Sequence, residues 1–344
     1  MNIYNSFDKK LITTVFIGLF FFLLFNHTNT SSVAYAQPSG EIVNFPDRQF
    51  EIAVREQIGK QSGTIDSSEL IFIDELRIEN RGIRDLTGIQ YFPNLDYLGA
   101  YNNNIQDLSP LAGHPSLRNA NFGDNIISDL TPLSTIPNLE YLYLWNNRIS
   151  DLSTLGNQPR LRSLYLSNNM INDLTPLVNM PRLSDLGISN NPSINNAEML
   201  KPLTNSTIEY LDLSNLRINS LGPLTSMLNL KRLNIGNTQI TDISGIDKIT
   251  GLEDLTIQGL RLQDYSPIKN LPFLEDLSVS DTNWTTEQIN NLMSPGSFEF
   301  LESFTCYSCN LTDVSFVKNI PFLRRLEIHD NKLSDISPIY ELQY

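Results

Sequence analysis

From Ile73 onward, the hydrophobic residues of this chain recur with a period of 22 positions. The stretch that begins at Leu139 reads LEYLYLWNNRISDLSTLGNQPR and is apolar at positions 1, 4 and 6. Apolar residues that alternate with polar ones over positions 3 to 7 predict a short strand with one buried face. Twelve consecutive units can be cut in this way, ten of 22 residues and two longer, and they begin at Ile73, Leu95, Leu117, Leu139, Leu161, Leu183, Ile208, Leu230, Leu252, Leu274, Leu301 and Leu323.

Two polar positions of the unit have predictable structural roles. An asparagine at position 9 can hydrogen-bond the backbone of neighbouring turns, and an aspartate at position 13 can start a 3-10 turn, often with a proline after it. The asparagines are Asn103, Asn125, Asn147, Asn169, Asn191 and Asn331, and the aspartates are Asp107, Asp129, Asp151, Asp173, Asp242 and Asp335. Position 9 lacks asparagine at Leu216, Thr238, Leu260, Thr282 and Cys309, where we expect looser turns.

These units predict a leucine-rich repeat solenoid over residues 73–344, with a parallel sheet on the concave face and 3-10 turns on the convex face. Twelve strands at about 4.8 Å each give a wall on the order of 50 Å long, which fits a protein better than a metabolite. The two longer units, 183–207 and 274–300, carry their extra residues after the strand. We expect those insertions to project from the convex side or the edge of the solenoid and to change its curvature locally.

Residues 37–72 are expected to form an N-terminal helical cap. Asp47 is a suitable N-cap, apolar residues from Phe50 to Ile58 follow at helical spacing, and Gly59 is a natural stop. A second short helix is expected at 67–72. Such an end piece covers the first core layer of a solenoid.

Residues 1–36 read as a signal peptide. Lys9 and Lys10 precede an apolar run of 15 residues, Leu11 to Phe25, and Ala34-Tyr35-Ala36 is a suitable cleavage site. The run is shorter than the roughly 20 residues of a membrane-spanning helix. The chain is therefore expected to be secreted, with no membrane span after cleavage; an uncleaved anchor is the alternative.

The charge of the chain is acidic, with a formal net charge of −14. Binding to nucleic acid requires basic surfaces that displace counterions, so this balance argues against a nucleic-acid partner. It favours a partner with a basic surface instead.

The chain resembles the internalin family of Gram-positive bacteria, best known from Listeria. The resemblance lies in the FPD-led helix ending in Gly59-Lys60, the segment GIRDLTGIQYFPNL (82–95), and the NxIxDLxPL repeats. It covers essentially all of the chain after residue 36. It implies a helical cap fused to a 22-residue solenoid whose concave face binds host proteins.

The C-terminal end departs from that family's usual plan. The sequence stops at Tyr344 inside the twelfth unit, with no immunoglobulin-like domain and no wall anchor after it. We expect either a short secreted variant or a truncated product. Five apolar residues are expected to face solvent on the open end, which favours fraying or self-association: Leu323, Leu326, Ile328, Leu333 and Ile336.

The expected binding residues are aromatic side chains at the outward strand positions of the first half of the array. Exposed Tyr and Trp on a rigid wall give a large contact area at low conformational cost. The candidates are Tyr97, Tyr101, Tyr141, Tyr143, Trp145, Tyr165 and Tyr210, with Arg148 and Met170 at their border. The alternative is that these aromatics only reflect β propensity, although Asn234, Thr256 and Ser278 hold equivalent positions later.

No catalytic or metal-binding motif accompanies the repeats. Cys306 and Cys309 form a CxxC, but positions 6 and 9 both face inward and no second Cys pair or His cluster completes a zinc site. We interpret them as small buried hydrophobic residues. His114 and His329 lie turns apart without a matched nucleophile. The chain is therefore expected to be a non-enzyme without cofactor.

The leading hypothesis is a secreted adhesion or virulence factor that binds a host protein, at the cell surface or inside the cell. A self-associating surface-assembly module is an alternative from a different class. A carbohydrate partner is a third, because Tyr and Trp also stack on sugars.

Overall fold

The structure is a computed structural model that describes residues 40–341. The expected signal peptide lies outside the described residues. Within the described part, no helix combines the length and the hydrophobicity needed to cross a bilayer.

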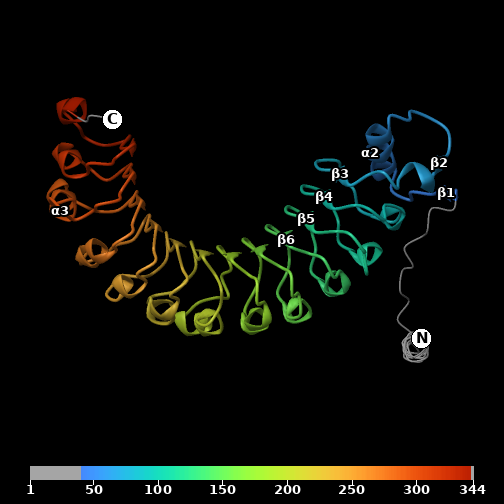
Figure 1. Ribbon diagram of the computed structural model, residues 1–344, viewed down its shortest axis with the longest axis horizontal. Coiled ribbons are helices and arrows are strands. Elements are labelled where there is room, and N and C mark those ends of the chain that lie inside the picture. Colours follow the sequence, from blue (N-terminus) through green and yellow to red (C-terminus); the bar gives the residue numbers. More distant parts are fainter. Residues whose placement is uncertain (1–39, 342–344) are drawn as a thin grey trace, which may run out of the picture. The chain divides into compact units, whose positions relative to one another are not determined.

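A parallel sheet of twelve strands lines the inner side of a curved solenoid (Figure 1). Each strand pairs only with its neighbours in the sequence, from β3 to β14. The strands are β3 (Glu75–Arg77), β4 (Tyr97–Gly99), β5 (Asn119–Asn121), β6 (Tyr141–Tyr143), β7 (Ser163–Tyr165), β8 (Asp185–Gly187), β9 (Tyr210–Asp212), β10 (Arg232–Asn234), β11 (Asp254–Thr256), β12 (Asp276–Ser278), β13 (Ser303–Thr305) and β14 (Arg325–Glu327). The predicted leucine-rich repeat fold is confirmed.

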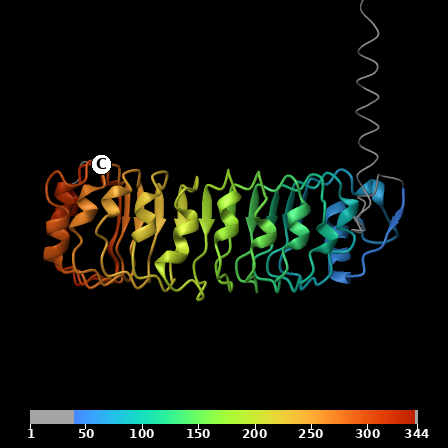
Figure 2. The same ribbon diagram turned by 90° about the horizontal axis from the view of Figure 1, so that it is seen from below.

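Short helical turns form the convex side, seen in front of the strands in Figure 2. They are η2 (Ile89–Tyr91), η3 (Ser109–Leu111), η4 (Thr131–Thr135), η5 (Ser153–Leu155), η6 (Thr175–Asn179), η7 (Ala197–Leu203), η8 (Gly222–Ser226), η9 (Ile246–Lys248), η10 (Ser266–Asn270), η11 (Ser315–Asn319) and η12 (Ser337–Glu341). The aspartate at position 13 starts them as predicted, since Asp107 accepts a hydrogen bond from Ser109 N at 2.7 Å and Asp151 one from Ser153 N at 2.7 Å.

The asparagines at position 9 hold successive turns together. Asn147 donates through Nδ2 to Phe122 O at 2.9 Å and to Leu144 O at 3.1 Å, and its Oδ1 accepts from Ile127 N at 2.9 Å. One amide thus satisfies backbone groups of two units in a core that excludes water. Thr238 at the same position donates only to Ile235 O in its own unit, at 2.8 Å.

The N-terminal cap is a helix plus a two-stranded antiparallel sheet. Helix α2 (Arg48–Ile58) begins after Asp47, whose side chain accepts from Gln49 N and Phe50 N, and ends at Gly59 in the left-handed conformation, as predicted. The other carboxylate oxygen of Asp47 accepts from Arg84 N at 2.7 Å, which joins the cap to the first repeat. The antiparallel pairing of β1 (Ile42–Val43) with β2 (Ile65–Asp66), which flank α2 in the sequence, was not predicted. The second helix is shorter than expected, a 3-10 turn η1 (Ser67–Glu69) with an Asp66 capping box.

The two insertions lie after their strands. The first lengthens η7, and the second forms an α-helix, α3 (Thr286–Leu292), beside the convex turns at the C-terminal end (Figure 1). Trp284 in the second insertion is buried and its ring contacts that of Tyr265, with centroids 3.8 Å apart. The indole therefore anchors the inserted segment to the preceding repeat.

The interpretation of the two cysteines as separate small hydrophobic residues was wrong in one respect. Both are fully buried, as expected, but Cys306 and Cys309 are joined in a disulfide with Cα atoms 5.8 Å apart. Positions 6 and 9 point into the same core layer, which brings the two sulfurs together.

The last described repeat is less exposed than the sequence suggests. Leu323 is buried, and Leu326, Ile328 and Leu333 are half-buried because they pack back on the core of the preceding unit. Ile336 is exposed, as expected.

Candidate protein-binding surface

The sheet register sets the candidate residues side by side on the concave face. Position 5 of one strand pairs with position 5 of the next, so Tyr143 of β6 lies directly opposite Tyr165 of β7. Their rings stack almost in parallel, with centroids 5.2 Å apart and planes 4° apart. These two rings form the centre of the candidate surface.

Two glycines allow the neighbouring aromatic rings to lie close to the sheet. A Cβ on Gly187 of β8 would stand 2.8 Å from Cδ1 of Tyr165, and one on Gly123 would stand 2.2 Å from Cε2 of Trp145. Real Cβ contacts are not that short, so any other residue would displace the rings. Trp145 therefore lies across the preceding repeat and Tyr165 across the following one.

The surface continues to β9 and ends at a fixed arginine. The Tyr165 and Tyr210 rings lie 6.3 Å apart, and the Arg232 guanidinium sits 4.9 Å from the centre of the Tyr210 ring. Arg232 also forms an ion pair with Asp185 at 3.1 Å. The cation–π contact and the ion pair together hold this arginine at the end of the aromatic residues. We call Trp145, Tyr143, Tyr165 and Tyr210 the aromatic surface.

The phenols of this surface stay neutral. Burial is the main cause that raises the pKa of Tyr143 and Tyr210, and it raises the pKa of Tyr165 to about 12, with Asp185 as the next cause. Each tyrosine thus offers a hydroxyl that can donate or accept and a flat apolar ring.

The remaining candidate residues lie beside or apart from the aromatic surface. Tyr141 opens β6 and is the most exposed of the candidate tyrosines at 37%. Tyr97 is two strands away in the sheet, where Arg77 lies 4.8 Å from its ring centre. Tyr101 is half-buried one repeat before Gly123, and Arg148 and Met170 are exposed one residue past the asparagines at position 9.

Sequence reasoning did not identify the roles of three residues that shape this surface, Gly123, Gly187 and Asp185, or the contact of Arg232 with Tyr210. A signal was present, because a glycine at an outward strand position next to an aromatic residue in the adjoining repeat permits such an overlap. In the described residues, no group of three or more His, Cys, Asp or Glu is placed to hold a metal ion.

Two family models match the chain. One describes the leucine-rich repeat domain of the endo-β-N-acetylglucosaminidase EndoS and matches residues 45–191, and the other describes two leucine-rich repeat copies and matches residues 206–248. No curated protein matches.

Solved structures resemble it over most of its length. An internalin from Listeria monocytogenes, InlF, is 28% identical with a TM-score of 0.69, and the match covers 87% of this chain and 94% of that one. Internalin C2 of the same species is also 28% identical, with a TM-score of 0.58, over 66% of this chain and 100% of that one. The functional domain of InlJ, which includes a cysteine ladder, shares the fold at 22% identity and a TM-score of 0.54, over 87% and 74%.

Repeat geometry and these likenesses define the chain as a leucine-rich repeat protein. More narrowly, it is an internalin-like one. A solenoid of this kind is typically a scaffold that binds proteins.

Proposed function

We propose that this chain is an exported, non-enzymatic scaffold that binds a host protein on its aromatic surface and acts in adhesion or virulence. The supporting observation is the continuous aromatic surface on a rigid sheet, with glycines that let the rings lie flat. Rigid aromatic residues at the centre of an interface are typical hot spots. The signal peptide expected at residues 1–36 and the likeness to internalins support export.

The test compares capture of host proteins by residues 37–344 with capture by two variants. The first is Tyr143→Ala with Trp145→Ala, which removes ring area; the second is Gly123→Ala, which keeps every aromatic residue but displaces the Trp145 ring. A protein identified by mass spectrometry is then titrated by calorimetry. We expect the double variant to bind at least about 30-fold more weakly, since each hot-spot truncation costs roughly 1–4 kcal/mol.

The matched controls lie on the later strands. Thr256→Ala with Ser278→Ala changes two outward position-5 residues, and Gly236→Ala adds a methyl at the position equivalent to Gly123, where the nearest atoms belong to Asn234 and Gln258 and not to an aromatic ring. Both should bind like the wild type, and all variants should keep the wild-type melting temperature within a few degrees. Wild-type affinity of both aromatic-surface variants would refute the proposal.

A carbohydrate partner is the second candidate, favoured by the exposed edges of the same tyrosines and by the match to a repeat domain of a glycosidase that acts on glycans. Titration with the deglycosylated form of the captured protein separates the two. Loss of binding after deglycosylation would assign the surface to the sugar.

A further inference from the structure

The last residue of each repeat has a recurrent structural role on one flank of the solenoid. It immediately precedes the first leucine of the next unit, and in the earlier units it is often polar and bonded to the preceding turn. Asn94 donates to Ile71 O at 2.7 Å, Ser116 to Pro93 O at 2.7 Å and Asn138 to Pro115 O at 2.6 Å. A polar side chain here therefore ties one turn to the one before it.

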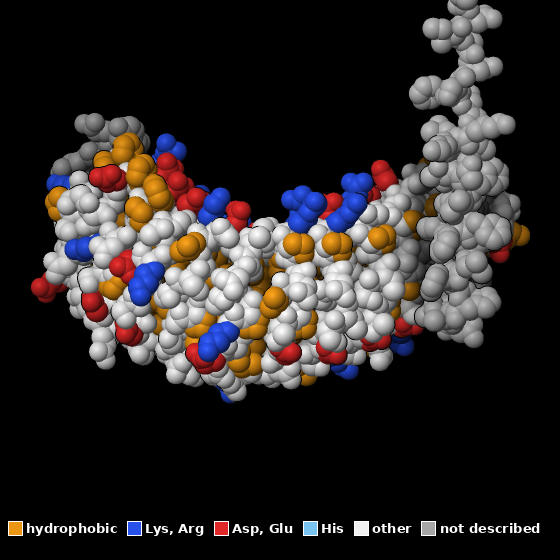
Figure 3. All heavy atoms as spheres, turned by 60° about the horizontal axis from the view of Figure 1, so that its bottom comes forward, with side chains coloured by type: hydrophobic (Ala, Val, Ile, Leu, Met, Phe, Trp, Pro, Cys, Tyr) orange, Lys and Arg blue, Asp and Glu red, His pale blue; other side chains and the backbone are white. Residues whose placement is uncertain are grey.

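In three consecutive units near the C-terminal end, phenylalanine takes this place. Phe273, Phe300 and Phe322 are 54%, 48% and 51% exposed, and the rings of the first two lie 6.3 Å apart. Apolar side chains gather at the C-terminal end of the surface in Figure 3. Three adjacent repeats have thus replaced a bonded polar residue by an exposed aromatic ring, which a solvated flank does not require.

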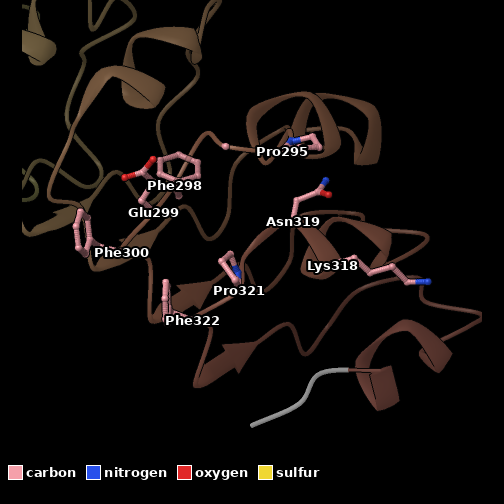
Figure 4. Close-up of a pocket in the computed structure, with 9 residues that line it drawn as sticks. Pro295, Phe298, Glu299, Phe300, Lys318, Asn319, Pro321 and Phe322 are labelled. Carbon is pink, nitrogen blue, oxygen red and sulfur yellow. The ribbon is translucent and has the colours of Figure 1, made fainter.

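A cleft of about 520 Å³ lies between the last two of these rings. Figure 4 shows Phe298, Glu299 and Phe300 on one side and Lys318, Pro321 and Phe322 on the other. Phe298 is buried and forms part of its wall. We call the three phenylalanines and this cleft the flank surface.

Charges beside the flank surface follow a regular order. The unit that ends at Phe300 contributes a carboxylate, Glu299, and the next unit contributes an ammonium, Lys318. After the phenylalanines comes a second pair with the same order, Glu302 and then Arg324, 3.1 Å apart. In both pairs the acidic group thus belongs to the earlier repeat and the basic group to the later one.

We propose that the flank surface binds a second copy of this chain, antiparallel, about a two-fold axis through the cleft. Such an axis sets Phe300 against Phe322 of the other copy, and it reverses the order of the repeats. Glu299 then faces the other copy's Lys318, and Glu302 faces its Arg324, so these four charged groups form a self-complementary patch, as an isologous interface requires. The concave faces stay open in this dimer, and two linked copies of a binding surface raise avidity.

The area of the flank surface determines how strongly the two copies are expected to associate. A fully buried phenylalanine contributes roughly 150–250 Å², so three half-exposed rings and the neighbouring prolines supply a few hundred Å² per copy. A stable standard interface buries about 800 Å² per partner. The dimer is therefore reversible and depends on protein concentration.

The test is sedimentation velocity of residues 37–344 from low to high micromolar concentration. The wild type should shift from monomer toward dimer. Glu299→Lys alone sets two lysines against two lysines, and Lys318→Glu alone sets two glutamates against two glutamates, so each should raise the dimer dissociation constant at least about tenfold. An equimolar mixture of these two variants should form a heterodimer again, because each copy then supplies the charge that the other lacks.

A third variant, Phe300→Asn with Phe322→Asn, installs the residue that equivalent positions carry at Asn94 and Asn138. It should fold normally and stay monomeric. A wild type that remains monomeric at every concentration overturns the proposal, and so does a dimer that persists in both single variants. Dimerisation that the charge variants leave unchanged would indicate association through the open end at Ile336 instead. None of these variants touches the aromatic surface, so the outcome is separate from that of the proposed function.

Discussion

His114 is a fully buried titratable side chain in the second repeat. Its Nδ1 accepts hydrogen bonds from Ser116 N at 3.3 Å and Leu117 N at 3.2 Å, so the ring is neutral with its proton on Nε2. Burial lowers the pKa of His114 from 6.5 to about 4, against a smaller opposite effect of a bond to the Phe92 backbone. A proton on Nδ1 would also break the two backbone bonds.

This histidine makes the stability of the solenoid depend on pH. The unfolded chain binds the proton from about pH 6.5 downward, whereas the folded chain does so only near pH 4. As the pH decreases from about 6.5 to about 4, the free energy of unfolding therefore falls, by about 3 kcal/mol at most. His114→Gln introduces the residue that Gln158 supplies at the same position of a later repeat, and it should remove this fall. Urea unfolding of both proteins at pH 7.5, about 5 and about 4 measures it, and parallel pH profiles would contradict the assignment.

At the residue scale, the sequence located the aromatic residues but not their arrangement. Strand alternation predicts that Tyr143 and Trp145 point outward, since position parity alone decides which face a side chain takes. The overlap of Trp145 with Gly123, or of Arg232 with Tyr210, depends on rotamers and on contacts across repeats. The hydrophobic period carries no information on either, although the outward glycines of the neighbouring repeats permit the first overlap.

At the element scale, the asparagine turn is the repeated device that joins strands to the convex side. The amide of Asn169 repeats the bonds of Asn147, with Nδ2 2.9 Å from Leu144 O and Oδ1 2.9 Å from Ile149 N. Because each amide reaches into the preceding unit, its loss leaves buried backbone groups of two units without partners.

Asn147→Ala should therefore lower the free energy of unfolding by about 2–4 kcal/mol. The matched change is Thr238→Ala, which removes a single bond within one unit and should cost less than about 1.5 kcal/mol. Equal losses in urea unfolding of the two variants would show that the bonds between units contribute nothing beyond the local one.

Element boundaries were predictable where one residue type decides them. Asp47 and Gly59 mark the ends of α2 because a cap needs an acceptor and a left-handed residue. The antiparallel pair of β1 and β2 was missed because each strand has two residues, too few for an alternation. The Cys306–Cys309 bond was missed because inward register also fits two unlinked side chains.

At the scale of the whole molecule, the position-9 asparagines divide the solenoid into two regions. They are unbroken over five repeats, from Asn103 to Asn191, and then absent over five repeats until Asn331. In a repeat protein, stability is close to a sum over units and their nearest-neighbour interfaces. A region whose units lack one kind of interface bond therefore opens more easily than its neighbour.

Hydrogen exchange followed by mass spectrometry can measure this difference along the chain. Peptides that cover β5–β7 should exchange more slowly than peptides that cover β10–β12, because opening of the first region breaks the amide bonds between turns as well as the core. Thr238→Asn, which restores the amide in the second region, should slow exchange in β9 and β10 and leave β5–β7 unchanged. Since the core residues of both regions are equally buried, as at Leu142 and Leu255, apolar packing does not predict such a contrast. Uniform exchange along the array would mean that the leucine core, and not the asparagine turns, sets the local stability. The rigidity of the aromatic surface would then come from packing alone.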